Sequence, residues 1–135
     1  MTVNLQVYSK ASALVQGRVV GFGSLDVPAS IEITGDKFEK TVPVANAANT
    51  VMYADELGGF NYLAIASDYD TRILLTDTGG DTFSLQIRGS GTSNEPGPPQ
   101  EFFQDHTSDD TDRINAVRVF NESGNAAQVS LVVLE

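Results

Sequence analysis

Hydrophobic and polar positions alternate in the middle of the chain. Within residues 82–88, Phe83, Leu85 and Ile87 alternate with polar residues, and this period of two places one face of a strand on a core and the other in water. Two further apolar stretches precede it, FNYLAIAS and TRILLT, and turns rich in Asp and Gly separate all three. Because such turns join neighbouring strands directly, residues 60–88 predict a half-buried antiparallel meander.

The N-terminal part of the chain also alternates. Val3, Leu5 and Val7 stand between polar residues and predict a first strand that begins almost at the terminus. Residues 9–23 fit one or two helical turns as well as a loop, but their glycines are unfavourable in a helix. We therefore expect a short connection and then an irregular strand around residues 18–22.

Two hairpins are predicted on either side of the meander. In the first, residues 30–34 pair with residues 37–44 across a tight turn at Gly35. In the second, residues 113–120 pair with residues 126–134 through NESGN, which has the composition of a hairpin turn. Both termini are then expected to lie in strands.

Residues 89–112 differ from the rest of the chain. They contain three prolines, three glycines and no aliphatic side chain, so we expect no strand of the sheet there. A loop of this length inside a compact domain is usually functional or flexible. It contains no Lys or Arg, and its acids are Glu95, Glu101, Asp105, Asp109, Asp110 and Asp112.

The spacing of these elements predicts the fold class. About eight or nine short strands separated by turn residues indicate an all-β protein. We expect an antiparallel β-sandwich or jelly roll of about eight strands. No linker or repeat divides the chain, so we expect one domain over residues 1–135, with an N-terminal arm or strand at 1–23 and a long acidic Pro/Gly loop at 89–112.

The charge balance restricts the partners. The chain has 8 basic and 18 acidic residues, a formal net charge of −10, which argues against nucleic acid or an anionic membrane as the main partner. No stretch approaches the ~20 apolar residues of a membrane span, and the start has none of the features of a secretion signal. Residues 1–25 carry Lys10 and Arg18 and no acid, so a slightly positive arm precedes an acidic body.

The sequence offers little for catalysis. It has no cysteine and a single histidine, His106, which excludes thiolate zinc sites and paired imidazoles within one chain. The nucleophile elbow G-x-S-x-G and the phosphate-binding loop G-x-x-x-x-G-K-[ST] are both missing. We expect no enzyme activity, no catalytic residue and no cofactor. If a cation binds, the candidates are Asp109, Asp110 and Asp112, although their spacing is not that of an EF-hand.

Phe102 and Phe103 are adjacent aromatic residues within the polar Pro-rich loop. Two exposed phenyl rings would lower solubility, so both are expected to be covered. The sequence leaves two alternatives: the rings pack against this domain, or they pack against a neighbouring subunit.

Several features occur together in this chain: a strand at the extreme N-terminus, no cysteine, the small-residue loop ANAANT, the region 60–88, and the closing pair INAVRVFNESGNAAQVSLVVLE. This combination resembles the small virion proteins of tailed bacteriophages, β-sandwich subunits that decorate or cement a capsid. The resemblance covers about residues 60–135 and includes no invariant motif.

The resemblance implies a protein that works by repeated symmetric contact rather than by catalysis. The implied partners are further copies of the chain, with a trimer favoured, and a larger shell such as a major capsid protein. The implied location is the virion, with synthesis in the host cytoplasm; a neck or tail protein of the same virion is the alternative. We expect the assembly contacts in the arm and in the long loop, at Val3, Leu5, Val7, Arg18, Phe102 and Phe103.

Two other functions stay open. One is a β-sandwich module that binds carbohydrate or calcium through its loops. The other is a small hydrolase that uses carboxylates, for which the candidates are Asp68, Asp70, Asp110 and Asp112.

Overall fold

The computed structural model describes residues 2–15, 18–34, 36–104 and 113–135, and in the first two of these ranges it describes the backbone alone. The described residues form strands, turns and loops and include no helix, so none of them belongs to a helix that could cross a membrane. The contacts divide the chain into two units, Met1–Gly35 and Asp36–Glu135. Each unit is described by itself.

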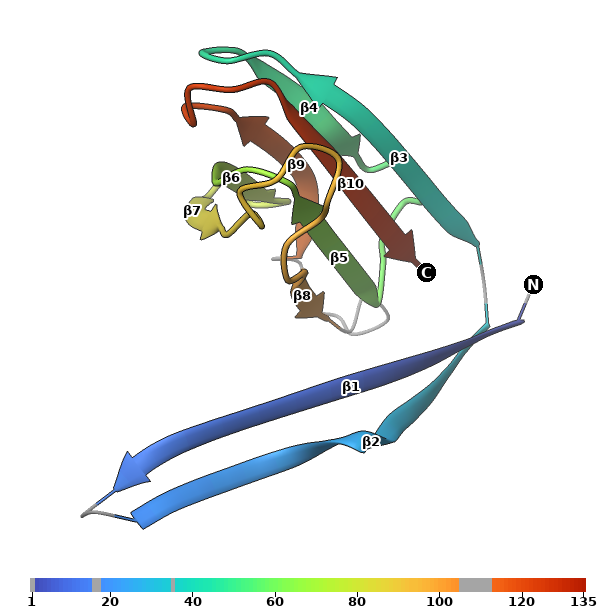
Figure 1. The fold of residues 1–135 in the computed structure, drawn as a ribbon. Coiled ribbons are helices and arrows are strands. Elements are labelled where there is room, and N and C mark those ends of the chain that lie inside the picture. The colour runs from blue at the N-terminus through green and yellow to red at the C-terminus, as the bar shows by residue number, and fades with distance from the viewer. Residues whose placement is uncertain (1, 16–17, 35, 105–112) are drawn as a thin grey trace. The chain divides into compact units, whose positions relative to one another are not determined.

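The second unit is a β-sandwich, which confirms the predicted fold class (Figure 1). One antiparallel sheet has the strand order β3-β10-β5-β8 and the other has the order β4-β9-β6-β7. The bounds are β3 Lys37–Val44, β4 Asn49–Ala54, β5 Tyr62–Ser67, β6 Thr71–Asp77, β7 Thr82–Ile87, β8 Gln100–Phe103, β9 Ile114–Phe120 and β10 Ala127–Leu134.

The strand order is that of a jelly roll. Strands pair from the two ends of the unit toward its middle: β3 with β10, β4 with β9, β5 with β8 and β6 with β7. These four pairs belong to one long hairpin whose turn lies between β6 and β7. Rolling this hairpin up places successive pairs in alternate sheets, and the contacts of β10 with β5 and of β9 with β6 close the two sheets.

The core lies between the two sheets and follows the period of two. Along β6, Ile73 and Leu75 are buried and alternate with partly exposed residues, and β10 repeats the pattern with Val129 and Leu131. Aromatic rings add edge-to-face contacts around Tyr53, whose centroid lies 5.6 Å from that of Phe38 and 5.7 Å from that of Phe60.

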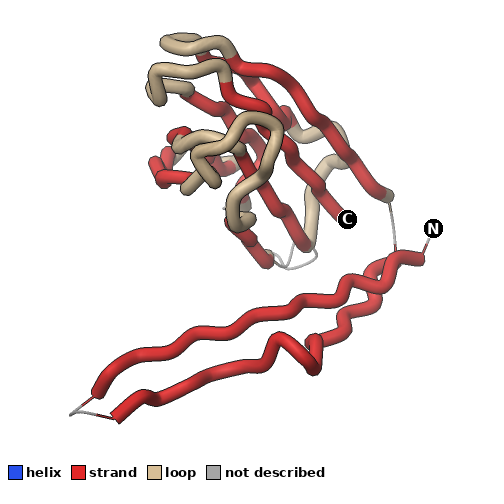
Figure 2. Tube along the Cα trace, in the orientation of Figure 1, coloured by secondary structure: helices blue, strands red, loops and turns tan. Residues whose placement is uncertain are grey.

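The first unit is a two-stranded antiparallel ribbon, drawn as a tube in Figure 2. Strand β1 runs over Thr2–Val15 and β2 over Arg18–Thr34, with an irregularity in the register between Val7 and Ser9. Both strands are far longer than the 5 to 6 residues of an average strand. The predicted first strand is confirmed, and the segment 9–15 that could have been helical is part of it.

The register makes one half of this ribbon amphipathic in sequence. Val3 stands opposite Ile33, Leu5 opposite Ile31 and Val7 opposite Ala29, whereas the positions between them are polar on both strands, Asn4 opposite Glu32 and Gln6 opposite Ser30. Residues directly opposite in an antiparallel ladder share a face. One face of the ribbon therefore collects apolar positions and the other face polar ones.

Both predicted hairpins that flank the meander are wrong. Residues 30–34 belong to β2, which pairs with β1, while β3 pairs with β10 at the other end of the chain. Residues 113–120 and 126–134 correspond to β9 and β10, which lie in different sheets. Local turn composition cannot distinguish a hairpin from a connection that crosses between sheets, because both need the same turn residues.

The predicted meander is half right. Strands β6 and β7 form the expected hairpin, but β5 lies in the opposite sheet. The prediction that residues 89–112 contain no strand is also wrong, because β8 pairs with β5 across four residues. The prolines end just before β8, so its amides are free to pair. The prediction of a single domain over residues 1–135 stays a prediction.

Candidate binding groove at one end of the sandwich

Four loops gather at one end of the jelly roll, because alternate connections of a rolled hairpin lie at the same end. They join β3 to β4, β5 to β6, β7 to β8 and β9 to β10. Backbone hydrogen bonds connect them: Ala47 N donates to Asn121 O at 2.8 Å, and Gly91 N donates to Asp68 O at 2.8 Å. This loop end is therefore a connected structure rather than four separate turns.

Asp68 is the anchor of the loop end. Its side chain is buried, and each carboxylate oxygen accepts a backbone N–H: Oδ1 from Gln128 at 2.8 Å and Oδ2 from Asn94 at 2.9 Å. The residue thus joins the loop that follows β5 to the start of β10 and to the loop that follows β7. A buried carboxylate in this position supplies acceptors that the backbone donors would otherwise lack.

The loop after β7 passes very close to the loop after β5. A Cβ atom at Gly89 would lie 2.4 Å from the carbonyl oxygen of Asp68 and from two backbone atoms of Tyr69, and one at Gly97 would lie 2.5 Å from the carbonyl oxygen of Arg88. Only glycine permits this approach of backbones. The described residues 89–99 are held further by Gly97 N, which donates to Ser67 O at 2.9 Å, and by the Ser90 hydroxyl, which donates to Glu95 O.

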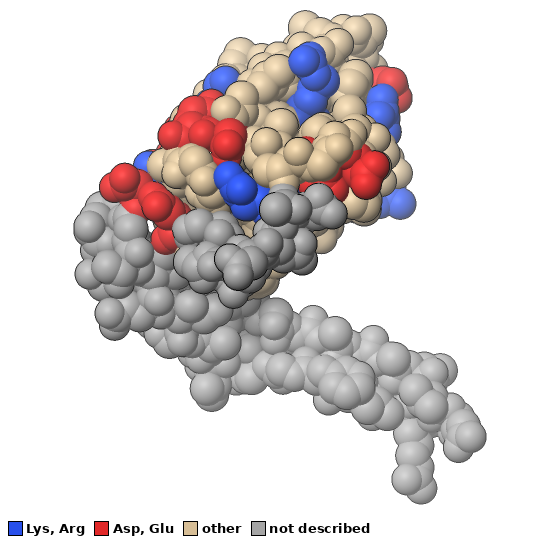
Figure 3. Space-filling view, turned by 180° about the vertical axis from the view of Figure 1, so that it is seen from behind, with Lys and Arg blue, Asp and Glu red and all other residues tan. Residues whose placement is uncertain are grey.

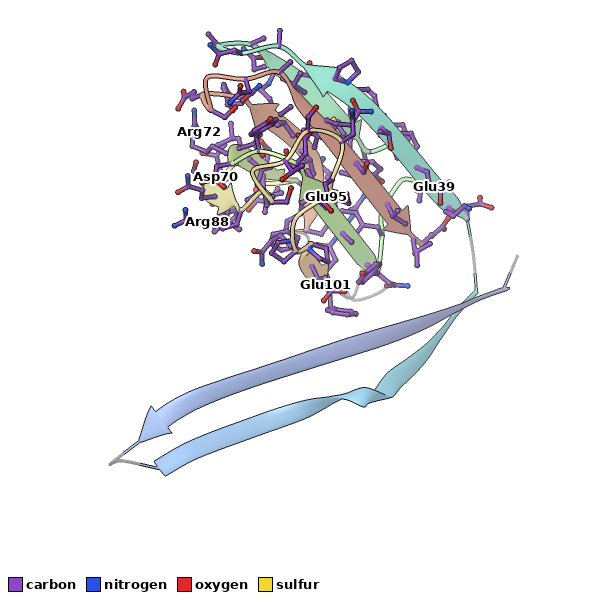
Figure 4. The ribbon with its side chains drawn as sticks, in the orientation of Figure 1. Glu39, Asp70, Arg72, Arg88, Glu95 and Glu101 are labelled. Carbon is purple, nitrogen blue, oxygen red and sulfur yellow. The ribbon has the colours of Figure 1, made fainter. Side chains whose placement is uncertain are left out.

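A groove of about 540 Å³, open to solvent, lies across the loop end. Three segments line it: the turn into β6, the end of β7 with the loop that follows, and the loop before β10. Figure 4 shows Asp70, Arg72 and Arg88 near one another on this part of the molecule. The lining residues are Tyr69, Asp70, Thr71, Arg72, Gln86, Gly89, Ser90, Gly91, Glu122 and Ser123.

The charged groups of the groove already have partners. The Arg72 guanidinium lies 4.2 Å from the centroid of the Phe120 ring, donates to Ser84 Oγ at 3.3 Å and approaches Glu122 at 3.8 Å. Asp70 accepts a bond from Gly89 N at 2.9 Å and pairs with the exposed Arg88 at 3.2 Å. The groove therefore presents neutral hydroxyl and amide groups around charges that are largely balanced.

This arrangement suits hydrogen bonding to a neutral polar ligand better than it suits acid–base chemistry. Among the described residues, Tyr53 and Tyr62 have raised pKa values, and neither of them lines the groove. Burial raises the pKa of Tyr53, which is a core residue. Burial, and second a hydrogen bond to Glu101 at 2.7 Å, raise the pKa of Tyr62 on β5. Displaced pKa values mark catalytic groups when they lie in a cleft, and here both tyrosines have structural roles.

Two of the four carboxylates proposed for a hydrolase, Asp68 and Asp70, have structural contacts. Both carboxylate oxygens of Asp68 accept hydrogen bonds from backbone N–H groups. Asp70 lines the groove and forms an ion pair with Arg88. Asp109, Asp110 and Asp112 lie outside the described residues, as does His106. Within the ranges that are described, no group of three or more His, Cys, Asp or Glu side chains is placed to hold a metal ion.

The residues predicted to make assembly contacts lie in two places. Val3, Leu5 and Val7 occupy β1, and Arg18 begins β2. Phe102 and Phe103 occupy β8, where Phe102 packs against the core, and Phe103 is exposed and lies 5.0 Å from the Tyr62 ring. The chain's own domain thus covers one phenylalanine of the pair, and the other stays at the surface.

The groove residues Tyr69, Arg72, Gln86 and Glu122 were not selected from the sequence. They come from segments up to about fifty residues apart and carry no motif, so only the jelly-roll topology brings them together. The signal that could have found them is the pairing of strands from the two ends inward, which places alternate loops at one end.

The described surface of the sandwich contains no continuous basic area on the face shown in Figure 3, where basic side chains stand in separate places among acidic ones. Comparisons of the chain with known protein families, curated proteins and solved structures find no match.

Proposed function

We propose that this protein is a non-enzymatic structural subunit of a virus particle, a capsid decoration protein that binds the shell through its N-terminal ribbon. The single observation that carries the proposal is the ribbon itself. A two-stranded ribbon is marginally stable in water on its own, yet β1 and β2 are 14 and 17 residues long. An element of that length needs a partner that covers its apolar face.

The sandwich supports the same function by analogy. Jelly rolls of eight strands are found among viral capsid domains and among lectins, and fold alone does not decide between them. The acidic composition and the groove with balanced charges favour work by surface contact. A neck or tail protein of the same particle is the alternative, and it differs from a decoration subunit in copy number.

The test is sedimentation of assembled particles with the full chain. We expect the protein to travel with the particles in a number of copies that scales with the shell. A few copies per particle would favour the neck or tail, and no association would reject the proposal.

A pair of ribbon variants tests which face makes the contact. Leu5→Asp places a charge at an apolar register position, and Gln6→Asp places the same charge at the neighbouring polar position. We expect the first to abolish particle binding and the second to preserve it. Equal binding of the two variants would reject the ribbon's apolar face as the contact.

A second candidate function is carbohydrate binding at the loop end. The observation that favours it is the groove, which combines one aromatic ring, Tyr69, with hydroxyl, amide and carboxylate groups, the set that fixes a polar ligand in an open site. A glycan array with and without a chelator tests it. Binding that Gln86→Ala and Glu122→Ala remove would support this function over the first.

A further inference from the structure

The sandwich has four edge strands, and three of them carry features that prevent pairing with another chain. Strand β3 contains three charged residues and Pro43. Strand β8 has only four residues, follows two prolines and contains Glu101. Strand β4 is interrupted by a register shift after Val51, whose carbonyl accepts a bond from Lys40 Nζ at 3.0 Å.

Strand β7 has none of these features. Its sequence TFSLQI contains no charge and no proline, and its register with β6 is uninterrupted from Thr82 to Ile87. Among the described strands it is hydrogen-bonded to β6 alone. A flat, uncharged edge of this kind is a template for strand addition.

The apolar residues of β7 are also uncovered. Phe83 and Leu85 stand opposite Leu75 and Ile73, which are buried core residues, but they are themselves 52% and 39% exposed. The row of core-facing residues therefore continues onto β7 beyond the cover of the opposite sheet, which ends there in the short strand β8.

The hydrogen-bond pattern shows which backbone groups are available. Asp77 N donates to Asp81 O at 3.0 Å across the turn, so bonded pairs alternate from that point along the hairpin. Phe83 and Leu85 then bond to β6, whereas the N–H and C=O groups of Ser84 and Gln86 point away from it. These free groups are what a further strand would pair with.

We propose that β7 pairs antiparallel with β7 of a second copy of this chain and so joins two sandwiches into one continuous eight-stranded sheet. Charge complementarity identifies this occupant. Asp81 precedes the strand and Arg88 follows it. Antiparallel pairing brings the acidic start of each strand toward the basic end of the other, whereas parallel pairing would bring like charges together.

The two-fold arrangement also covers the apolar residues. An axis perpendicular to the sheet keeps both core-facing sides on the same side of the joined sheet. With Ser84 at the axis, Phe83 of each copy stands opposite Leu85 of the other, and four exposed apolar side chains meet across the junction. This pairing does not depend on binding to a shell, and it gives a dimer where the resemblance implied a trimer.

The test is the mass of the full chain in solution across a range of concentrations, with two matched lysine variants. Leu85→Lys changes β7, and Val51→Lys changes β4, the opposite edge of the same sheet, at a nearly equal exposure of 38%. We expect the unmodified chain to form a dimer. Leu85→Lys should raise the dissociation constant of this dimer by about tenfold or more, a change of about 1.4 kcal/mol. Val51→Lys should leave the dissociation constant unchanged. A monomer at all concentrations, or equal weakening by both variants, would overturn the proposal.

Hydrogen exchange of the unmodified chain gives an independent measurement that needs no variant to fold. We expect the amides of Ser84 and Gln86 to gain protection as concentration rises through the dimer transition. Protection of these amides in a chain of monomer mass would mean that another segment of the same chain covers β7, and it would overturn pairing between copies.

Discussion

The ribbon and the sandwich are built from the same kind of strand and differ in the number of their own layers. In the sandwich the apolar rows of the central strands face the opposite sheet, so Ile73, Leu75, Val129 and Leu131 are almost fully buried. In the ribbon the register also collects an apolar row, from Val3 opposite Ile33 to Val7 opposite Ala29, but a two-stranded unit has no second layer. Period-two alternation in the sequence therefore specifies which face of a sheet is apolar, but it does not specify what packs against that face.

The most severe test of this comparison replaces one leucine in each unit. Leu131→Ala removes a core side chain that is 1% exposed, and we expect it to lower the free energy of unfolding by about 3 kcal/mol. Leu5→Ala changes the ribbon's apolar row, and we expect less than about 0.5 kcal/mol for the isolated chain. Urea unfolding of the full chain measures both.

An equal loss of stability in the two leucine variants would contradict the comparison. It would mean that the ribbon's apolar row is buried as completely as the core within one copy of the chain. A ribbon buried in this way could not supply the shell contact proposed above.

The next test concerns the loop end. Asp68→Ala removes the acceptors of Gln128 N and Asn94 N, and we expect it to cost about 2 kcal/mol because both backbone donors lose the partner that the buried Asp68 provides. The matched control is Asp68→Asn, which retains one acceptor oxygen and should cost about half as much. If urea unfolding gives a similar loss of stability for the two variants, the loops hold together without this carboxylate.

Local patterns in the sequence predict the strands well and their pairing poorly. The alternation in TFSLQI is visible within six residues, and β7 begins and ends close to the predicted bounds. The pairing of β3 with β10 joins residues about ninety positions apart, and no local signal encodes it. The NESGN turn shows why: Asn121 is buried and donates to Val44 O at 2.7 Å, a contact that connects the two sheets.

The candidate site was predicted less well for the same reason. Asp68 and Asp70 stand out in the sequence as loop carboxylates, but their partners lie as far as sixty residues away along the chain. A buried anchor and a catalytic acid cannot be told apart until those partners are known. Tyr69, Gln86 and Glu122 carry no signal of their own and become a groove only when three segments meet.

A smaller effect is expected in alkali, and it comes from a tyrosine of the sandwich. The pKa of Tyr62 is raised, so the folded state keeps this proton after the unfolded state has lost it at about pH 10. The protonated Tyr62 hydroxyl therefore contributes its full share of the free energy of unfolding below about pH 10. This share falls as the pH rises further, by at most about 1.4 kcal/mol for each pH unit. Tyr62→Phe should cost about 1 kcal/mol at pH 7, through the lost bond to Glu101.

Urea unfolding at several pH values from 9 to 11 checks this expectation. The unmodified chain should lose stability above about pH 10 more steeply than Tyr62→Phe does, although Tyr53, whose pKa is also raised, keeps some of the slope in both. Parallel curves for the two proteins would show that the Tyr62 hydroxyl titrates alike in the folded and unfolded states.

The smallest expected effect separates two arginines that lie near each other. Arg72 places a planar guanidinium over the Phe120 ring at 4.2 Å, and lysine cannot reproduce both this stacking and the bond to Ser84, so Arg72→Lys should cost about 0.5 kcal/mol. Arg88 makes an exposed ion pair with Asp70, and Arg88→Lys should change stability by less than about 0.3 kcal/mol. Thermal unfolding of the two variants side by side measures the difference. If Arg88→Lys is the more harmful change, the exposed pair holds the loop end more strongly than the stacked guanidinium does.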